Sequence, residues 1–407
     1  MITTFCLSDL RSQLCAHGEN KTFIQPFPNG FNSINQLLSE GIKWAIENEE
    51  DVILFVLNPL NQLPTYALIE KSIQIAVDSN IHLLYIQNHH TDGIRFSSHF
   101  LMENNLIDVD AFLITKGLFH YIIHILEELD QDIDSDLLSK ILKLVCPYNF
   151  VLNPEQDFIQ AENNIVLITP FRNAGNYLQE CVDSVAQQNY GNYKHILLDD
   201  DSDDGGLESI KETEKLIAKK NTIRKYAIRN IADELLNTDF GDDDIICFLD
   251  GDDALAHNYV LAIINGVYHQ YNCALTYGGM SIMNANGVVS DKYSSSEFLR
   301  LREVTWKAFH FRTFKYHLFK EVIHQDPHLS FLKDEENNFL KMPYDMAILF
   351  PLMEISGYQK SKHISASLYK YRLHSQNDHI LSESEQSKGE RIIRNKASFP
   401  ITNHNDI

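Results

Sequence analysis

The sequence predicts an α/β protein whose larger part is a Rossmann-like, mostly parallel sheet flanked by helices. Three short apolar runs rich in Ile, Val and Leu support this fold class, within residues 163–171, 194–206 and 242–253. Such runs are typical of strands buried on both faces. Segments with helical spacing of apolar residues separate them, and this alternation favours a doubly wound sheet.

The elements of this part can be justified in order. "NNIVLITPF" (163–171) is the first predicted strand. Either Asn173 or Asn176 is suited to cap the helix that follows. That helix carries an apolar stripe of Leu178, Cys181, Val182 and Val185. After the runs that end near residues 206 and 253, residues 258–271 predict a helix and residues 273–280 a strand.

The first 150 residues predict a smaller α/β accessory domain. Residues 37–64 contain a helix and then the apolar strand "VILFVL", and residues 109–122 predict another strand and helix. Residues 151–163 are interpreted as a linker because of their proline and polar content. The main domain is therefore expected over residues 164–400.

Composition excludes several classes of partner. Lys and Arg number 34 against 56 Asp and Glu, so the formal charge is −22, which argues against nucleic acid and anionic membrane surfaces. The six cysteines have no metal-ligand spacing and are expected to be buried free thiols. No run approaches the ~20 apolar residues of a transmembrane segment, and no signal peptide is visible. A cytoplasmic protein is the expectation.

Two of the predicted strands end in clusters of acids. "ILLDDDSDD" closes one run and "FLDGDD" closes another. Ligands of open α/β sheets bind beyond the carboxyl ends of the strands. Carboxylates there suit a hard cation such as Mg²⁺ or Mn²⁺, which bridges a protein to substrate phosphates. An ordinary acidic surface loop is the alternative for either cluster taken alone.

These segments also carry a resemblance. "IVLITPFRNAGNYLQECVDSVAQQNYGNYKHILLDDDSDDG" resembles the opening of the family 2 glycosyltransferases of the GT-A fold, and "FLDGDDAL" is similar to their DxD segment. Further similarities follow in order within residues 308–319, 343–357, 368–379 and 391–396. The resemblance implies transfer from a nucleotide diphosphate sugar, with inversion, to a glycan, lipid-linked or protein acceptor.

The resemblance extends more weakly to the amino-terminal region. The helix and strand of residues 37–64 are similar to the pair that leads into a DxD motif, but here the strand is followed by Asn58, Pro59 and Leu60. Residues 1–150 are therefore interpreted as a degenerate GT-A-like domain without a metal site, and any α/β accessory domain is the alternative.

The resemblance implies a nucleotide site. Three residues match the loop that cups the nucleotide base: Thr169, Pro170 and Phe171. Asp200 matches the residue that accepts a hydrogen bond from the base, which favours a UDP donor. Arg229 and Asn230 match an Arg-Asn pair near the nucleotide, with a solvated helix face as the alternative.

The resemblance also implies a metal site. Asp250 and Asp252 match the acids that contact the ribose and the Mn²⁺ or Mg²⁺ ion, and Asp253 matches a supporting acid. His374 and His379 lie in the closing segment, where relatives sometimes supply a further metal ligand. A surface position is the alternative for both histidines.

Asp345 matches the catalytic base, because inversion needs a carboxylate that takes the proton of the attacking hydroxyl. A helix-start acid favoured by the helix dipole is the alternative. Glu354 and Asp326 are the next candidates for the base. "HFRTF" offers His310 and Arg312 for the diphosphate or the acceptor, or for a structural role.

The chain departs from the family pattern in two places. Asp201 stands where Asp-Asp-Gly-Ser has glycine, and Arg224 and Lys225 stand where relatives often have a glycine before the Arg-Asn pair. Two other function classes stay open. A metal-dependent nucleotidyl or phosphate enzyme would show a glycine-rich basic loop, which "PFRNAGNY" matches poorly. A non-catalytic sugar-nucleotide-binding module would not need both the acidic strand ends and Asp345.

Overall fold

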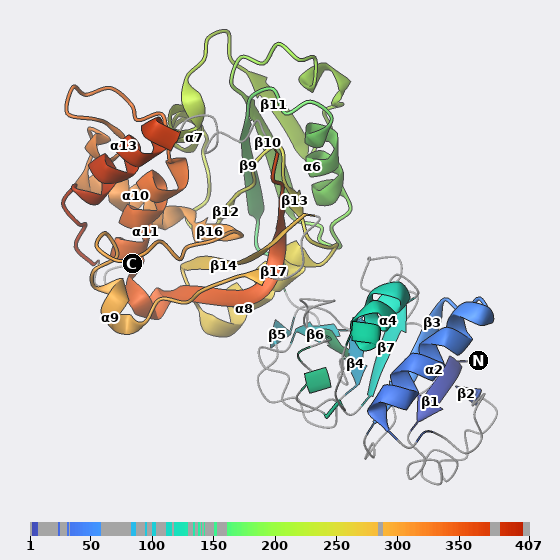
Figure 1. Ribbon diagram of the computed structural model, residues 1–407. Helices are drawn as coiled ribbons and strands as arrows, with labels where there is room; N and C mark the ends of the chain where they lie inside the picture. The colour runs from blue at the N-terminus through green and yellow to red at the C-terminus, as the bar shows by residue number, and fades with distance from the viewer. Residues whose placement is uncertain are drawn as a thin grey trace. The chain divides into compact units, whose positions relative to one another are not determined.

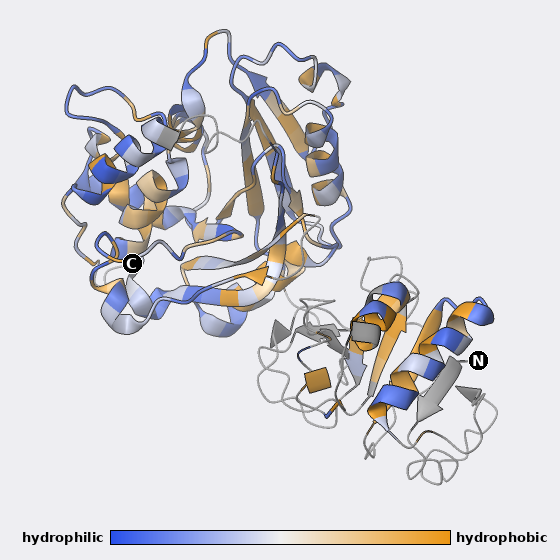
Figure 2. Cartoon of the chain, viewed as in Figure 1, coloured by the Kyte–Doolittle hydropathy of each residue, from blue (hydrophilic) through white to orange (hydrophobic). Residues whose placement is uncertain are grey.

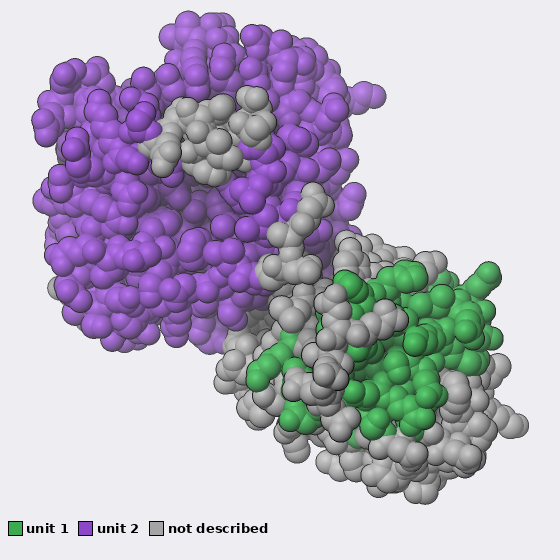
Figure 3. Space-filling view, in the orientation of Figure 1, with its two compact units in different colours: residues 1–160 green, residues 161–407 purple. Residues whose placement is uncertain are grey.

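The computed structural model describes residues 161–283, 288–374 and 383–401 continuously, and separate segments of residues 1–160. Those segments are residues 2–6, 23–24, 31, 33–57, 83–86, 94–95, 100–102, 111–115, 118–128, 133–134, 137–138, 140, 142 and 150–152. The chain divides into two compact units, residues 1–160 (unit 1) and 161–407 (unit 2), which Figure 3 colours separately. Most of the predicted linker, residues 153–160, lies outside the described residues.

Unit 2 is a nine-stranded sheet with helices on both faces (Figure 1). Its strands are β9 Ile165–Phe171, β10 Tyr193–Asp199, β11 Leu216–Lys220, β12 Ile245–Phe248, β13 Ala254–Leu255, β14 Leu275–Ile282, β15 Val288–Val289, β16 Arg312–Lys315 and β17 Ser361–Tyr371. Its helices are α6 Tyr177–Ala186, η3 Leu207–Ser209, α7 Tyr226–Asn237, α8 Val260–Tyr271, α9 Ser295–Phe298, α10 Tyr316–Gln325, η4 Ser330–Leu332, α11 Tyr344–Lys360 and α13 Glu383–Arg394.

The strand order of this sheet is β11-β10-β9-β12-β16-β14-β17-β13, with β15 paired to β14. Strands β11, β10, β9 and β12 are parallel neighbours, which confirms the predicted fold class. Beyond β12 the sheet is mixed, because β16 comes later in the chain and inserts antiparallel between β12 and β14. The parallel part brings the carboxyl ends of β9, β10 and β12 to one edge.

The core lies on both faces of the sheet because side chains alternate along each strand. Ile196 and Leu198 of β10 pack in the cluster that includes α7, α10 and α11. Leu197 between them packs with Leu178 and Val182 of α6 on the opposite face. Figure 1 shows α6 on one side of the sheet and α7, α10, α11 and α13 gathered on the other, and Figure 2 shows the central strands as apolar.

Helix α13 packs closely against the chain that enters α11. A Cβ atom added at Gly389 would lie 1.9 Å from the Met342 carbonyl oxygen, so only glycine fits there. A buried ion pair connects α11 to the segment between α9 and β16: Arg302 of that segment donates to both carboxylate oxygens of Glu354 on α11, at 2.6 and 2.8 Å. Arg302 also donates to the Ile393 carbonyl oxygen of α13. The start of α11 is therefore held by a later helix.

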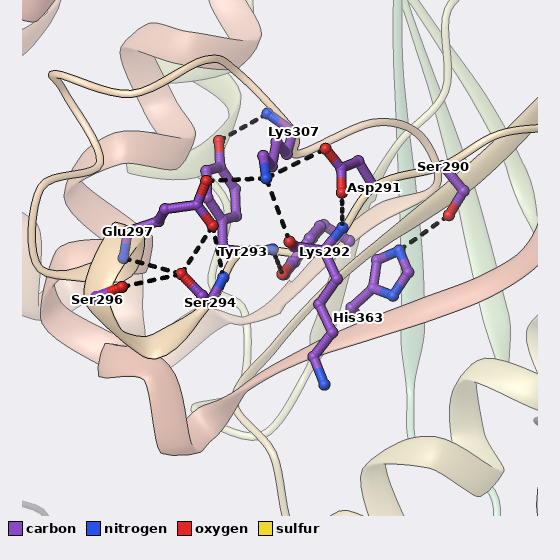
Figure 4. A network of polar contacts seen from close by, with 10 residues as sticks. Ser290, Asp291, Lys292, Tyr293, Ser294, Ser296, Glu297, Lys307 and His363 are labelled. Atoms are coloured by element: carbon purple, nitrogen blue, oxygen red, sulfur yellow. Dashed lines mark hydrogen bonds and ion pairs between the residues drawn. The ribbon is translucent and has the colours of Figure 1, made fainter.

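A polar network fixes the segment that leads to β16 (Figure 4). Lys307 Nζ lies 3.2 Å from Asp291 and 2.9 Å from Glu297, and the Lys307 N–H donates to the Tyr293 hydroxyl. Ser294 caps α9 in a reciprocal capping box with Glu297. The network positions the residues immediately after Lys307, which reach the candidate site.

Unit 1 contains an eight-stranded sheet of order β2-β1-β3-β7-β4-β8-β6-β5. Its elements are β1 Ile2–Cys6, β2 Phe23–Ile24, α2 Ile34–Glu47, β3 Val52–Val56, β4 Leu83–Ile86, β5 Ile94–Arg95, β6 Phe100–Met102, β7 Ala111–Thr115, α4 Phe119–Glu128 and β8 Phe150–Leu152. Helix α2 begins at Ser33, whose side chain accepts from the Gln36 N–H, and it buries an apolar stripe.

The two sheets share a topology over six strands. In unit 1, strands β2-β1-β3-β7-β4-β8 have the same chain order and directions as β10-β9-β12-β16-β14-β17 of unit 2. Helix α2 precedes β3 as α7 precedes β12, and α4 follows β7 as α10 follows β16. Unit 1 therefore has the architecture of the core of unit 2.

Two expectations from composition can be compared with the described residues. Cys181, Cys247 and Cys273 are buried free thiols, as expected, and burial raises the pKa of each. Among the described helices, none has both the length and the apolar character required to cross a bilayer.

The Arg302–Glu354 pair predicts a measurable stability loss. Glu354→Gln leaves the buried Arg302 charge unpaired and is expected to destabilise unit 2 by about 3–5 kcal/mol. Urea unfolding followed by Trp306 fluorescence, in a Trp44→Phe background, isolates this unit because the chain has two tryptophans. Glu303→Gln, at a surface pair with Arg300, is the control and should change stability by less than ~0.5 kcal/mol. Equal effects of the two variants would contradict the prediction.

Candidate active site

Residues 250–253, which follow β12 and are called the acidic loop below, lie against the end of β9. A Cβ atom added at Gly251 would lie 2.5 Å from Phe171 Cβ and 3.6 Å from Thr169 Cγ2, so glycine is required for this approach. Thr169 is itself fixed by its hydroxyl, which lies 2.8 Å from His195 Nε2. The acidic loop and the predicted nucleotide loop therefore meet at one edge of the sheet.

Asp250 is joined to the start of α11. Its Oδ1 atom accepts a hydrogen bond from the Tyr344 hydroxyl at 2.6 Å, and His310 Nε2 lies 3.9 Å from Oδ2. Burial and, next, the negative charge of Asp252 raise the pKa of Asp250. Burial lowers the pKa of His310, so this ring is neutral and does not compensate the carboxylates.

Asp253 anchors β17. Its Oδ2 atom accepts from the Tyr369 hydroxyl at 2.7 Å, and its Oδ1 atom accepts from the Arg372 N–H at 2.7 Å. The same Tyr369 hydroxyl accepts from the Asp250 N–H. Burial, followed by the charges of Asp250 and Asp252, raises the pKa of Asp253 to about 9. The third acid thus ties the last strand to the loop.

Asp252 faces His374. Their Oδ2 and Nε2 atoms are 2.8 Å apart, and about a fifth to a quarter of each side chain is exposed. The His374 ring also lies 5.2 Å from the ring of Tyr177 on α6. His379, the other histidine considered from the sequence, lies outside the described residues.

The carboxylate of Asp252 and the ring nitrogen of His374 are ligands that fit a divalent cation which also binds substrate phosphates. Among the residues that the structure describes, no three His, Cys, Asp or Glu side chains form a complete metal cage. Mg²⁺ in phosphate-transfer sites needs only one or two protein carboxylates, because substrate oxygens complete its shell. Asp252 and His374 can supply such a partial set, and a cation bound there would also reduce the repulsion between Asp252 and the neighbouring Asp250.

Asp345 lies in the first turn of α11, one residue after Tyr344. Its Oδ1 atom accepts from the Met346 N–H at 2.8 Å, and its Oδ2 atom lies 2.8 Å from Arg312 Nη2. Arg312 is buried on β16 and also donates to the Ala308 carbonyl oxygen. The carboxylate is therefore held in one orientation, close in the chain to the partner of Asp250.

Asp200 receives hydrogen bonds from the loop and helix that follow β11. The donors are the Lys225 and Tyr226 N–H groups at 2.6 and 2.9 Å and the side-chain amides of Asn230 and Asn221 at 2.9 and 3.3 Å. A carboxylate has about four acceptor sites. A uracil imide would therefore replace one of these donors, and Asn221 makes the longest of the four bonds.

The structure separates the Arg-Asn pair. Asn230 turns to Asp200, whereas Arg229 forms an ion pair with Asp233 at 2.7 Å and stacks on the Phe339 ring. Arg229 is thus not brought to the acidic loop, while Arg224, one of the departures from the family pattern, lies 3.7 Å from Asp200.

Asp201 occupies a left-handed backbone conformation, with φ of 63°. This explains the glycine of the family pattern, and Asp is one of the residues that tolerate the conformation. Asn173, a possible helix cap from the sequence, instead accepts from the Asp203 N–H and donates its own N–H to Ser202. Asn176 precedes α6 but makes no side-chain cap bond.

Sequence reasoning did not find several contacts of the site. Tyr344 and Tyr369 bind the acids, and Arg372 donates through Nε to the Asp252 carbonyl oxygen at 2.8 Å. Tyr344 is next to the candidate Asp345, and Arg372 lies two positions before the candidate His374, which is the one signal that could have found them. Glu354, an alternative base, is instead paired with Arg302.

A family model matches part of unit 2, and several known proteins are similar to the chain. The family model described as "Glycosyl transferase family 2" matches residues 166–330. Over 277 residues the chain is 25% identical to the chondroitin synthase of Pasteurella multocida (strain Pm70), covering 66% of this chain and 27% of that protein. It is 26% identical over 135 residues to the putative teichuronic acid biosynthesis glycosyltransferase TuaG of Bacillus subtilis (strain 168), covering 32% of this chain and 51% of that protein.

Among solved structures, S. aureus TarS is 16% identical, with a TM-score of 0.40, and the match covers 55% of this chain and 39% of that one. The chain spans only about a quarter of the length of the chondroitin synthase and about half of the length of TuaG. The family match contains the strands β9, β10 and β12 and both of their acidic ends. Residues 166–330 thus form a glycosyltransferase domain of family 2, and the unit that contains them has the GT-A fold.

Proposed function

We propose that the chain is an inverting, cation-dependent glycosyltransferase that moves a sugar from a nucleotide diphosphate sugar, with UDP favoured, to a hydroxyl group of a glycan. The observation that carries the proposal is the link between Asp250 and Asp345. Tyr344 donates to Asp250, and the next residue is the candidate base, so the acid assigned to the donor is connected to the start of the helix that carries the acid assigned to the acceptor.

The residues of the site suit the two halves of a displacement. Bound between Asp252 and His374, a divalent cation would supply neutralisation of the diphosphate that leaves. Asp345 takes the proton of the acceptor hydroxyl while that oxygen forms a bond to the sugar C1 and the bond from C1 to the diphosphate breaks. Arg312 and the Met346 N–H orient the Asp345 carboxylate for this transfer.

The names of the relatives support a glycan as acceptor. Chondroitin synthase, hyaluronan synthase and a teichuronic acid glycosyltransferase are proteins of polysaccharide synthesis. Lipid-linked and protein acceptors would need the same base and donor site. For unit 1 we propose a GT-A-derived module without a metal site of its own, which positions an acceptor or a partner chain. Its shared six-strand topology supports this, and the residues after β3 and Leu57 are Asn58, Pro59 and Leu60 in the sequence.

A panel of nucleotide sugars tests the proposal. The full chain is incubated with Mn²⁺, each nucleotide sugar and mixed glycan acceptors, and the released nucleotide is measured. Release of UDP that depends on acceptor is the expected result. Binding of nucleotide sugars without release from any of them would identify a non-catalytic module instead.

If a cation binds at Asp252, removing either the cation or the Asp252 carboxylate should lower the rate of sugar transfer. EDTA should abolish transfer, and added Mn²⁺ should restore it. Asp252→Asn is expected to lower turnover by at least ~100-fold and to weaken donor binding, because the carboxylate that bridges to the cation is lost. Asp243→Asn, at an exposed ion pair with Lys315, is the matched control and should keep full activity. Normal cation-dependent turnover by Asp252→Asn would overturn the assignment.

If Asp345 is the general base, its substitution should lower kcat without weakening donor binding. Asp345→Asn is expected to lower kcat by ~10²–10⁴-fold, the usual contribution of a general base, with little change in calorimetric affinity for UDP. Arg312→Lys keeps the charge but loses the planar fork, so it should lower kcat less than Asp345→Asn does. If Asp345→Asn weakened UDP binding as much as Asp252→Asn, or kept normal kcat, Asp345 would belong to the donor site or to the scaffold.

A further inference from the structure

Arg372 lies at the junction of three parts of the site. It immediately follows β17, and its main-chain N–H donates to Asp253. Its Nε atom donates to the Asp252 carbonyl oxygen at 2.8 Å, and its Nη2 atom donates to Glu180 on α6. The guanidinium also lies 4.3 Å over the ring of Tyr177, in the first turn of α6. One side chain thus connects β17, the acidic loop and α6.

Arg372 and His374 hold the two ends of one residue. Arg372 binds the main chain of Asp252, whereas His374, two positions later, contacts its carboxylate at 2.8 Å. Tyr177 touches both, because its ring also lies 5.2 Å from the ring of His374. The orientation of the Asp252 carboxylate relative to His374 therefore depends on the contacts of Arg372.

The Arg372 guanidinium contacts the main chain of the acidic loop, and it forms an ion pair with Glu180 on α6. An arginine that paired with Asp252 would compete with a cation for the same oxygens. Here the guanidinium donates to a carbonyl oxygen of the loop and forms its ion pair with Glu180, which lies on α6 outside the loop. Only 15% of the Arg372 side chain is exposed, whereas 58% of the Glu180 side chain is, so this pair lies at the solvent-facing end of the contact.

We propose that Arg372 is the positioning residue of the cation site. Together with Glu180 it fixes the main chain at Asp252, so that the Asp252 carboxylate and His374 face one divalent cation. The inference rests on the proposed function, because it assumes that a cation binds at Asp252. It assigns a role in that site to Arg372 and to the exposed Glu180, neither of which contacts the cation.

The test measures Mn²⁺ binding directly, without donor or acceptor. The full chain is titrated with Mn²⁺, and the free ion is followed by its electron paramagnetic resonance signal. Arg372→Met is expected to weaken Mn²⁺ binding by ~10–100-fold, the usual effect of losing an outer-shell partner. Arg372→Lys should recover part of the loss, since it keeps the charge but donates from a single point.

Glu180 provides a second variant that leaves the acidic loop intact. Glu180→Gln should weaken Mn²⁺ binding less than Arg372→Met does, and the double variant should bind as Arg372→Met alone, because Glu180 acts only through Arg372. Arg300→Met, which removes an exposed arginine paired with Glu303, is the matched control and should bind Mn²⁺ normally.

The outcomes separate this inference from the proposed function. If Asp252→Asn loses Mn²⁺ while Arg372→Met, correctly folded by its unfolding temperature, keeps wild-type affinity, the role of Arg372 is overturned and the cation site stands. Effects of Arg372→Met and Glu180→Gln that multiply in the double variant would also overturn it. If the wild-type chain binds Mn²⁺ only when UDP is present, all the variants are compared with UDP present. If it binds no Mn²⁺ either alone or with UDP, the proposed cation dependence fails, and the inference fails with it.

Discussion

The carboxylates of Asp250, Asp252 and Asp253, within four residues after β12, repel one another. Hydrogen bonds from later segments of unit 2 offset this repulsion, and these bonds determine how those segments pack around the loop. Asp250 accepts from Tyr344, and Asp253 accepts from Tyr369 and from the Arg372 main chain. The hydrogen bonds of Asp250 and Asp253 thus come from later segments, α11 and the end of β17. Asp345 lies on α11, and His374 follows β17.

The family match and the site cover different parts of the chain. Residues 166–330 include the acidic strand ends and Arg312, but Tyr344, Asp345 and His374 come after them. The acidic strand ends therefore lie inside the matched range, and the side chains of Tyr344 and His374 that contact Asp250 and Asp252 come from the part of the chain that follows it. This division agrees with the general observation that one fold supports many chemistries through the segments added at its strand ends.

Patterns local in sequence predicted the strands of unit 2 and which of those strands end in acids. Apolar runs such as that of β9 report burial on both faces, and acids directly after β12 indicate the ligand edge. The position of β16 between β12 and β14 was not predictable, because pairing of strands distant in the chain leaves no local signal. The bond from Arg372 to the Asp252 carbonyl oxygen joins residues 120 positions apart and involves a main-chain atom, so no side-chain pattern encodes it.

The distance along the chain between the acidic loop and its partners has a consequence for synthesis. At ~5–20 residues per second, the ribosome needs on the order of 10 s to travel from Asp252 to Arg372 and His374. During that interval unit 1 is complete, whereas the nascent sheet of unit 2 carries its carboxylates without their hydroxyl and guanidinium partners. Because Gly389 packs against Met342, the start of α11, which carries Tyr344 and Asp345, cannot reach its final contacts until α13 has also been synthesised.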